Sequence, residues 1–252
     1  MTPAIDHVAL TVRDLPAMTA FYRDALGLNP LGGDGETARL GAGGRTLLEL
    51  RGDLAARTRD PRQAGLFHTA FLLPERADLA RWLRHAAETR LHLTGASDHG
   101  VSEAIYLDDP EGNGIEIYWD RPPSEWQRDG DRIRMVTLRL DPDGLLALAD
   151  RPWSGAPDGS RIGHVHLQVG DLDRAEDFFA GDLGLTRTFD GPGGAWYGWN
   201  GYHHHLAGNV WNSRGAGPRD RGTTGLAEIA IRDPARAGRT IADPWGTPFR
   251  FL

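Results

Sequence analysis

The chain contains no cysteine among its 252 residues. This absence excludes disulfide bonds, thiolate metal sites and cysteine nucleophiles together. No apolar run approaches the roughly 20 residues that a helix needs to cross a bilayer, so we expect no membrane partner. Any chemistry must use histidine, carboxylate and hydroxyl groups, and the chain has 10 histidines.

Positive charge is also scarce. The 28 basic residues are all arginine, and 35 acidic residues outnumber them, which gives a formal net charge of -7. Because a negative chain does not favour phosphate backbones, we expect no nucleic-acid partner. The sequence does not start with the basic, apolar and small-residue pattern of a secretory leader, so a cytoplasmic location is the default expectation. Hydrophobic and charged fractions of 40% and 25% are typical of a globular protein and exclude a coiled coil.

The chain repeats itself once, and the repeat predicts two similar modules. The segment HVALTVRDL, which starts at His7, returns as HVHLQVGDL from His164. The next segments, LPAMTAFYRDALGL and LDRAEDFFAGDLGL, also align without gaps. Alternating apolar and polar residues predict a strand in each copy, and apolar residues three and four apart predict a helix after it. Asp14 and Gly27 are suited to cap the first of these helices.

Each copy contains a second, more diverged half. Leu66 to Leu73 forms an apolar strand, and a helical pattern follows Pro74. We therefore predict a first module over residues 1–122, a connector rich in proline and charge over 123–160, and a second module over 161–252 whose second helix is shortened or lost. The 33 glycines and 16 prolines favour short strands and tight turns.

Three polar residues lie on otherwise apolar predicted strands of the first module. They are His7, His68 in LFHTAFLLP and Glu116 in DPEGNGIEIYW. A carboxylate buried without a partner costs several kcal/mol, so Glu116 should be paired or bound to a metal. Two histidines and one carboxylate form the facial triad of non-haem Fe(II) enzymes, which leaves positions open for substrate and dioxygen. Three unrelated strand residues remain the alternative.

The second copy does not repeat this set. His7 aligns with His164, and His68 aligns with His205. The segment DPEGNGIE aligns with DPWGTPFR, however, so that Arg250 stands at the position of Glu116. An arginine offers no lone pair to a metal and repels a cation. We therefore expect a degenerate metal site in the second module. The roles of its histidines stay open, including a partial site that uses one of them as a substitute ligand: His164, His166, His203, His204 and His205.

The repeated strand and helix, together with HTAF and DPEGNGIEIYWDRP, resemble the vicinal-oxygen-chelate superfamily of glyoxalases, bleomycin-resistance proteins and extradiol dioxygenases. Two further segments, SDHGVSEAIYLDDPEGNGIEIYWDRP and YHHHLAGNVWNS, look most like tandem-module catechol 2,3-dioxygenases. The resemblance implies an α+β fold of tandem modules, each a pair of βαβββ units that form a half-open barrel. It also implies that His7, His68 and Glu116 bind the metal.

The resemblance adds a catalytic histidine and a tyrosine ahead of the glutamate ligand, and His99 and Tyr106 match them. A histidine can exchange protons with a catechol hydroxyl near neutral pH. An exposed loop histidine and a structural tyrosine are the alternatives. Such enzymes usually carry one more active-site histidine shortly before the second ligand, on a facing strand, and none lies between Glu49 and Phe67.

The implied function is extradiol cleavage of a catechol-type ring, with a small aromatic substrate, dioxygen and Fe(II), or Mn(II) at the same ligands. A glyoxalase-like isomerase or lyase, or a non-catalytic protein that binds an aromatic ligand, are the alternatives on the same fold. The exposed edges of half-open barrels are compatible with a homo-oligomer.

Overall fold

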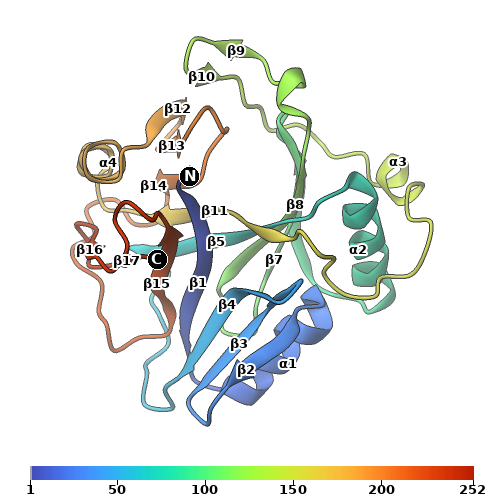
Figure 1. Ribbon diagram of the computed structural model, residues 1–252, viewed down its shortest axis with the longest axis horizontal. Coiled ribbons are helices and arrows are strands. Elements are labelled where there is room, and N and C mark those ends of the chain that lie inside the picture. The colour runs from blue at the N-terminus through green and yellow to red at the C-terminus, as the bar shows by residue number, and fades with distance from the viewer. Residues whose placement is uncertain (1) are drawn as a thin grey trace.

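Strands from the two halves of the chain are shared between two large curved sheets in this computed structural model, which describes residues 2–252 (Figure 1). We call them the β1 sheet and the β11 sheet. The β1 sheet has the spatial order β16 (Thr240–Ala242), β17 (Pro248–Phe251), β15 (Gly225–Arg232), β1 (Ala4–Val12), β4 (Arg45–Gly52), β3 (Thr37–Ala42) and β2 (Asn29–Gly33). The β11 sheet has the order β12 (Thr186–Gly191), β13 (Gly194–Gly198), β14 (Leu206–Asn209), β11 (Arg161–Gln168), β5 (Gly65–Leu72), β8 (Gly114–Asp120), β7 (Ser102–Asp108) and β6 (Leu93–Asp98).

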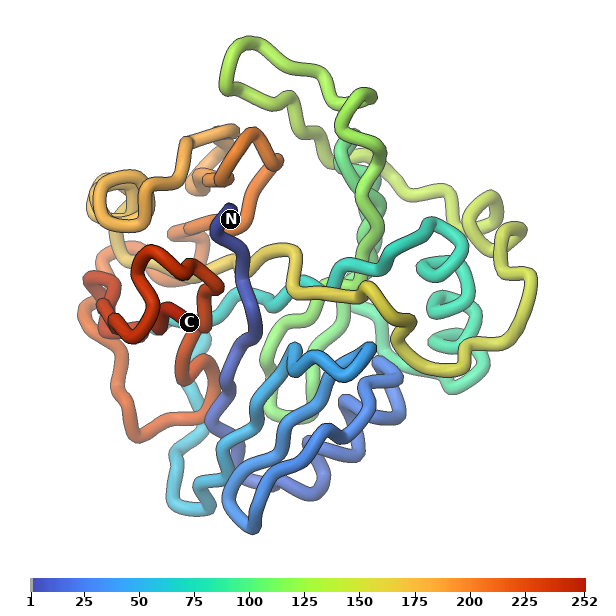
Figure 2. Tube along the Cα trace, viewed as in Figure 1, coloured from blue at the N-terminus to red at the C-terminus, as the bar shows by residue number. Residues whose placement is uncertain are grey.

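Each sheet joins an early part of the chain to a late part. Strand β1 pairs antiparallel with β15, and β11 pairs antiparallel with β5. Figure 2 shows the first of these pairings as the blue N-terminal strand beside the red C-terminal region. The expected α+β fold of half-open barrels is confirmed, but each sheet combines strands from residues 1–122 with strands from 161–252. The module boundaries themselves stay a prediction from the sequence repeat.

The helices cover the sheets and follow the sequence signals. Helix α1 (Leu15–Leu26) begins where the Asp14 carboxylate accepts a hydrogen bond from Ala17 N at 2.9 Å. It ends at Gly27, whose φ of 70° is left-handed. The other helices are α2 (Arg76–Glu88), α3 (Pro142–Leu146) and α4 (Leu172–Glu176), which continues as a π-helical turn over Asp177–Asp182. In residues 2–252, no helix is both long enough and apolar enough to span a bilayer.

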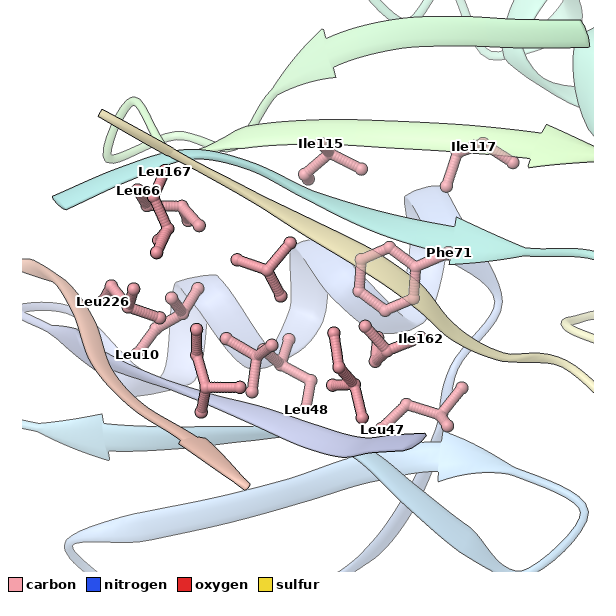
Figure 3. Packing of buried hydrophobic residues seen from close by; sticks show 14 of the residues in the cluster. Leu10, Leu47, Leu48, Leu66, Phe71, Ile115, Ile117, Ile162, Leu167 and Leu226 are labelled. Carbon is pink, nitrogen blue, oxygen red and sulfur yellow. The ribbon is translucent and has the colours of Figure 1, made fainter. Parts of the chain in front are cut away.

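The core lies between the two sheets (Figure 3). Leu10, Leu48 and Leu226 from the β1 sheet face Leu66, Phe71, Ile115, Ile117, Ile162 and Leu167 from the β11 sheet. Since successive strand residues point to opposite faces, filling this layer with one set turns the alternate set away from the core. The polar strand residues belong to that second set, so the packing directs them to the outer, concave faces.

The predicted connector contains only short secondary-structure elements. It contains a 3₁₀ turn (Pro123–Glu125), the short strands β9 (Arg128–Asp129) and β10 (Arg132–Ile133), and α3. Leu138 then forms an isolated β-bridge with Asp98 at the end of β6. The segment before this bridge, residues 135–137, lines the same cavity as His68 and Glu116.

Candidate metal centre and cavity

Three buried side chains converge on the concave face of the β11 sheet: His68, Glu116 and His164, the His/Glu cluster. They lie on the adjacent strands β5, β8 and β11. Strand register explains the convergence, because Ala70 of β5 is paired with His164 on one side and with Glu116 on the other. His68 lies two residues before Ala70 and so shares its face. The small Ala70 side chain leaves room for its neighbours to meet above it.

The ligand atoms of the cluster lie close to one another. His68 Nε2 is 3.0 Å from Glu116 Oε2, His164 Nε2 is 3.2 Å from the same oxygen, and the two Nε2 atoms are 3.2 Å apart. Three ligands on one face of an octahedron, each about 2.1 Å from a metal, would be about 3.0 Å apart. The exposed fractions of the three residues are only 7%, 3% and 2%. The set fits a divalent metal ion.

The protonation states of the cluster also suit a metal. Burial raises the pKa of Glu116, but the imidazoles of His164 and His68 outweigh it and hold that pKa well below its usual range. Burial lowers the pKa of His164 to about 4, against the opposing charge of Glu116. At neutral pH the site thus presents a carboxylate and a neutral imidazole, the forms that bind metals.

A cavity of about 360 Å³ lies over the cluster. Its wall is largely aromatic and apolar, with Phe67, Val101, Met135, Val136, Phe189, Pro192, Trp196 and Trp211. Phe67 and Trp211 meet edge to face, with ring centroids 5.2 Å apart. Such a wall suits a flat apolar ligand whose polar atoms reach the His/Glu cluster.

The structure places His99 and Tyr106 together in the same cavity wall. His99 Nδ1 is 2.8 Å from the carbonyl oxygen of Val136, and His99 Nε2 is 2.7 Å from the Tyr106 hydroxyl. Since a carbonyl only accepts, Nδ1 of His99 must carry a proton, and in the neutral ring Nε2 then accepts from Tyr106. Burial and the charge of Glu116 raise the pKa of Tyr106 well above its usual value, so Tyr106 keeps its proton.

His7 does not lie in the cluster, which corrects the ligand set expected from the sequence. It is on β1, in the other sheet, where its Nδ1 is 2.9 Å from Asp6 Oδ2. The reason is strand pairing: β5 pairs with β11 and not with β1, so His164 takes the place expected for His7 beside His68. The sequence repeat aligned these two histidines, and this signal could have identified His164.

The β1 sheet carries a matching arrangement, which we call the arginine triplet: His7, Glu228 and Arg250. Ala230 of β15 is paired with His7 on β1 and with Arg250 on β17. Arg250 Nε donates to Glu228 Oε1 at 2.8 Å, and Arg250 Nη2 is 3.4 Å from His7 Nε2. An ion pair therefore occupies the position that corresponds to the His/Glu cluster.

The strand register also shows that the residue corresponding to His68 in the β1 sheet differs from the one that the sequence alignment gave. The sequence alignment pairs it with His205, but Glu228 on β15 corresponds to His68 on β5, because each lies two residues before the paired alanine. His205 precedes β14, where its carbonyl oxygen accepts from Val165 N at 3.0 Å.

Two cavity histidines had no assigned role in the sequence, His204 and His166. His204 is buried and lines the cavity, with its ring centroid 4.0 Å from that of His164. Burial lowers its pKa well below the usual value, so the ring is neutral at neutral pH. His166 lies nearby on β11, with Nε2 3.0 Å from Asn209 Nδ2. The run of three histidines marked this region, but the sequence did not show which of them reaches the cavity.

Comparisons with known proteins agree with this fold. The sequence profile of the Glyoxalase/Bleomycin resistance protein/Dioxygenase superfamily matches residues 4–117. The catechol-2,3-dioxygenase of Bacillus subtilis (strain 168) is 39% identical over 228 residues, which cover 88% of this chain and 80% of that protein. Biphenyl-2,3-diol 1,2-dioxygenase 3 of Rhodococcus globerulus is 34% identical over 170 residues, which cover 63% of this chain and 86% of that protein.

Solved structures show the same fold. Glyoxalase I from Zea mays superposes with a TM-score of 0.58 at 17% identity, over 99% of this chain and 92% of that chain. The cppA protein from Streptococcus pneumoniae TIGR4 has a TM-score of 0.55 at 12% identity, over 99% of both chains. With its two curved sheets and these relatives, the chain belongs to the Glyoxalase/Bleomycin resistance protein/Dioxygenase superfamily.

Proposed function

We propose that the chain is an extradiol ring-cleaving dioxygenase that acts on a catechol-type aromatic substrate. The observation that carries this proposal is the cavity of about 360 Å³, which combines an aromatic wall with the His/Glu cluster and the His99–Tyr106 pair. The identity of 39% to a catechol-2,3-dioxygenase supports the same reaction class.

His68, Glu116 and His164 would hold the metal, for which we propose Fe(II), with Mn(II) able to use the same ligands. When bound, the metal supplies a Lewis acid for a catechol anion and a redox centre for the reaction with dioxygen. The three ligand residues come from adjacent strands on one side of the cavity, which would leave the rest of the cavity for the substrate and dioxygen.

The His99–Tyr106 pair handles protons in this proposal. His99 Nε2 accepts a hydrogen bond from Tyr106 before the substrate arrives. If the Tyr106 hydroxyl turns to a substrate oxygen, Nε2 becomes free to take a proton from a catechol hydroxyl and return it later. Because the carbonyl of Val136 holds the proton on Nδ1, the ring presents Nε2 as its basic atom.

His204 supplies the additional histidine that the sequence lacked ahead of His68. It reaches the cavity from the segment just before β14, across the His/Glu cluster from β7, which carries Tyr106. A catechol has two hydroxyl groups, and a second neutral imidazole gives the cavity a second proton acceptor. The aromatic wall would exclude water and stack on the ring.

Anaerobic loading of the full chain with Fe(II), followed by a panel of catechols, tests the proposal. We expect oxygen consumption and a product that contains both atoms of labelled dioxygen, measured by oxygen electrode and mass spectrometry. Glu116→Gln should lose bound metal and turnover together, whereas Glu228→Gln, a carboxylate change in the other sheet, should keep both.

The same experiment separates the alternatives on this fold. Turnover of a hemithioacetal with nickel or zinc, without oxygen consumption, would replace the dioxygenase by an isomerase. Tight binding of an aromatic ligand with no metal requirement would indicate a binding protein. Either result would contradict the proposal.

A further inference from the structure

A hydrogen-bonded chain of side chains leads from Asp120, at the end of β8, to His204 in the cavity wall. Asp120 Oδ1 is 2.8 Å from His203 Nε2, and His203 Nδ1 is 2.7 Å from His204 Nδ1. The other carboxylate oxygen of Asp120 accepts from the Tyr202 hydroxyl at 2.7 Å. His203 is fully buried, so water does not supply its hydrogen bonds.

With Asp120 ionised and His203 neutral, the hydrogen-bonding capacity of these groups fixes where the protons lie. An ionised carboxylate only accepts hydrogen bonds, so Nε2 of His203 must be the donor to Asp120. A neutral His203 then has an unprotonated Nδ1, which must accept from Nδ1 of His204. His204 consequently carries its proton on Nδ1 and has a lone pair on Nε2. Among residues 2–252, Nε2 of His204 has no hydrogen-bond partner, and the residue lines the cavity.

We infer that Asp120 is a positioning residue that acts through His203 to hold His204 with a basic Nε2 atom in the cavity. His204 is the group that would meet the substrate, whereas Asp120 and His203 only set its proton and its ring orientation. The arrangement uses the same logic as a carboxylate that orients the histidine of a hydrolase triad.

The role of Tyr202 is distinct and supplies a control. Its hydroxyl bonds to Asp120 and lies 2.9 Å from the hydroxyl of Tyr118, so it belongs to the same network. It is not part of the path from Asp120 to His204, however. Removing this hydroxyl leaves the contact between Asp120 and His203 in place, and the proton on His204 should not move.

The first test is independent of metal and activity. In the metal-free full chain labelled with ¹⁵N-histidine, the ring nitrogen shifts report which nitrogen carries the proton. His204→Gln and His203→Gln assign the two sets of signals by their loss. We expect one dominant form of His204, with the proton on Nδ1. A proton on Nε2 of His204, or two forms in similar amounts, would overturn the inference even if the chain proves to be a dioxygenase.

The second test compares two variants of Asp120 and its neighbour. Asp120→Ala removes the acceptor of the His203 proton, so the pair of imidazoles can reverse and His204 should show both proton positions. Tyr202→Phe should keep the single wild-type form. If Asp120→Ala, shown to be folded by circular dichroism, keeps the wild-type form as well, Asp120 does not position His204.

The kinetic consequence rests on the proposed function. With metal loaded, Asp120→Ala should lower kcat by about tenfold, which is less than the roughly 100-fold or more that a general base itself contributes, with KM and metal content unchanged. Tyr202→Phe should change kcat by less than Asp120→Ala. A fall in metal content, or a change confined to KM, would contradict a positioning role. If no variant and no wild-type chain turns over catechol, the proposed function fails, while the NMR result still decides the inference.

Discussion

The two curved sheets present the same backbone arrangement with opposite electrostatics. In the β11 sheet, a strand alanine is flanked by His164 and Glu116, and the His/Glu cluster can hold a cation. In the β1 sheet, the corresponding alanine is flanked by His7 and Arg250, and Arg250 forms an ion pair with Glu228. The guanidinium takes the role that a metal would have in neutralising the carboxylate. Duplicated folds can thus keep a site's backbone geometry and lose its chemistry through changes at two of its three side chains, here Glu228 in place of His68 and Arg250 in place of Glu116.

Among the variants that test this comparison of the two sheets, we expect the largest loss of metal affinity and turnover from a change at Glu116. Glu116→Gln removes the negative ligand and leaves two neutral imidazoles. Metal affinity should fall by more than the roughly 100-fold that the loss of an outer partner of a metal ligand can cost, and turnover should fall with it. Metal analysis after dialysis and oxygen uptake measure the two losses. An unchanged metal content would remove Glu116 from the ligand set.

The second prediction tries to rebuild the lost site. The double variant E228H/R250E places two imidazoles and one carboxylate at the register positions that His68, His164 and Glu116 occupy in the other sheet. We expect a second metal equivalent per chain in isothermal titration. The single variant R250E, which lacks the second imidazole, is the control. A folded double variant that still binds one equivalent would show that matching register does not suffice.

The third prediction concerns acid stability, because the β11 sheet holds deeply buried histidines. Burial lowers the pKa of His164 to about 4 and that of His205 to about 3, from the 6.5 of an unperturbed histidine. Below about pH 6.5, the unfolded chain therefore binds protons at these histidines that the folded chain does not bind. The contribution of these histidines to the free energy of unfolding of the metal-free chain should be complete above about pH 6.5. It should decrease as the pH is lowered toward 4 and then 3. Urea unfolding at several pH values measures this free energy. A free energy of unfolding that stays constant or increases as the pH is lowered from 6.5 to 3 would contradict the prediction.

The smallest effect is expected at Arg250. Its side chain is 35% exposed and that of Glu228 is 12% exposed, so solvent screens their ion pair. Arg250→Gln should lower the free energy of unfolding by about 1 kcal/mol and leave metal content and turnover unchanged. Urea unfolding beside a metal assay measures both. A loss of metal in this variant would mean that the two sheets are coupled in a way that the comparison does not include.

Local sequence predicted local structure well. The carboxylate of Asp14 and the left-handed Gly27 delimit α1 as expected, and His68 and Glu116 lie on strands as the sequence pattern predicted. The replacement of Glu116 by Arg250 in the repeat also corresponds to the observed strand register. These features depend on residues close together in the chain.

The pairing of strands that are distant in the chain could not be predicted from the sequence. His7 and His164 lie in nearly identical segments, so alternation gives both the same face and cannot assign either to a partner strand. Only the pairing of β5 with β11, rather than with β1, decides that His164 joins Glu116. The expected ligand His7 instead lies beside Arg250, the very residue that argued against a metal.

A matched pair of histidine variants tests the central claim, that the metal lies between β5, β8 and β11. After anaerobic loading with Fe(II), metal per chain should remain near the wild-type value in His7→Gln and be lost in His164→Gln. The opposite outcome, with loss of metal in His7→Gln and retention in His164→Gln, would contradict the account.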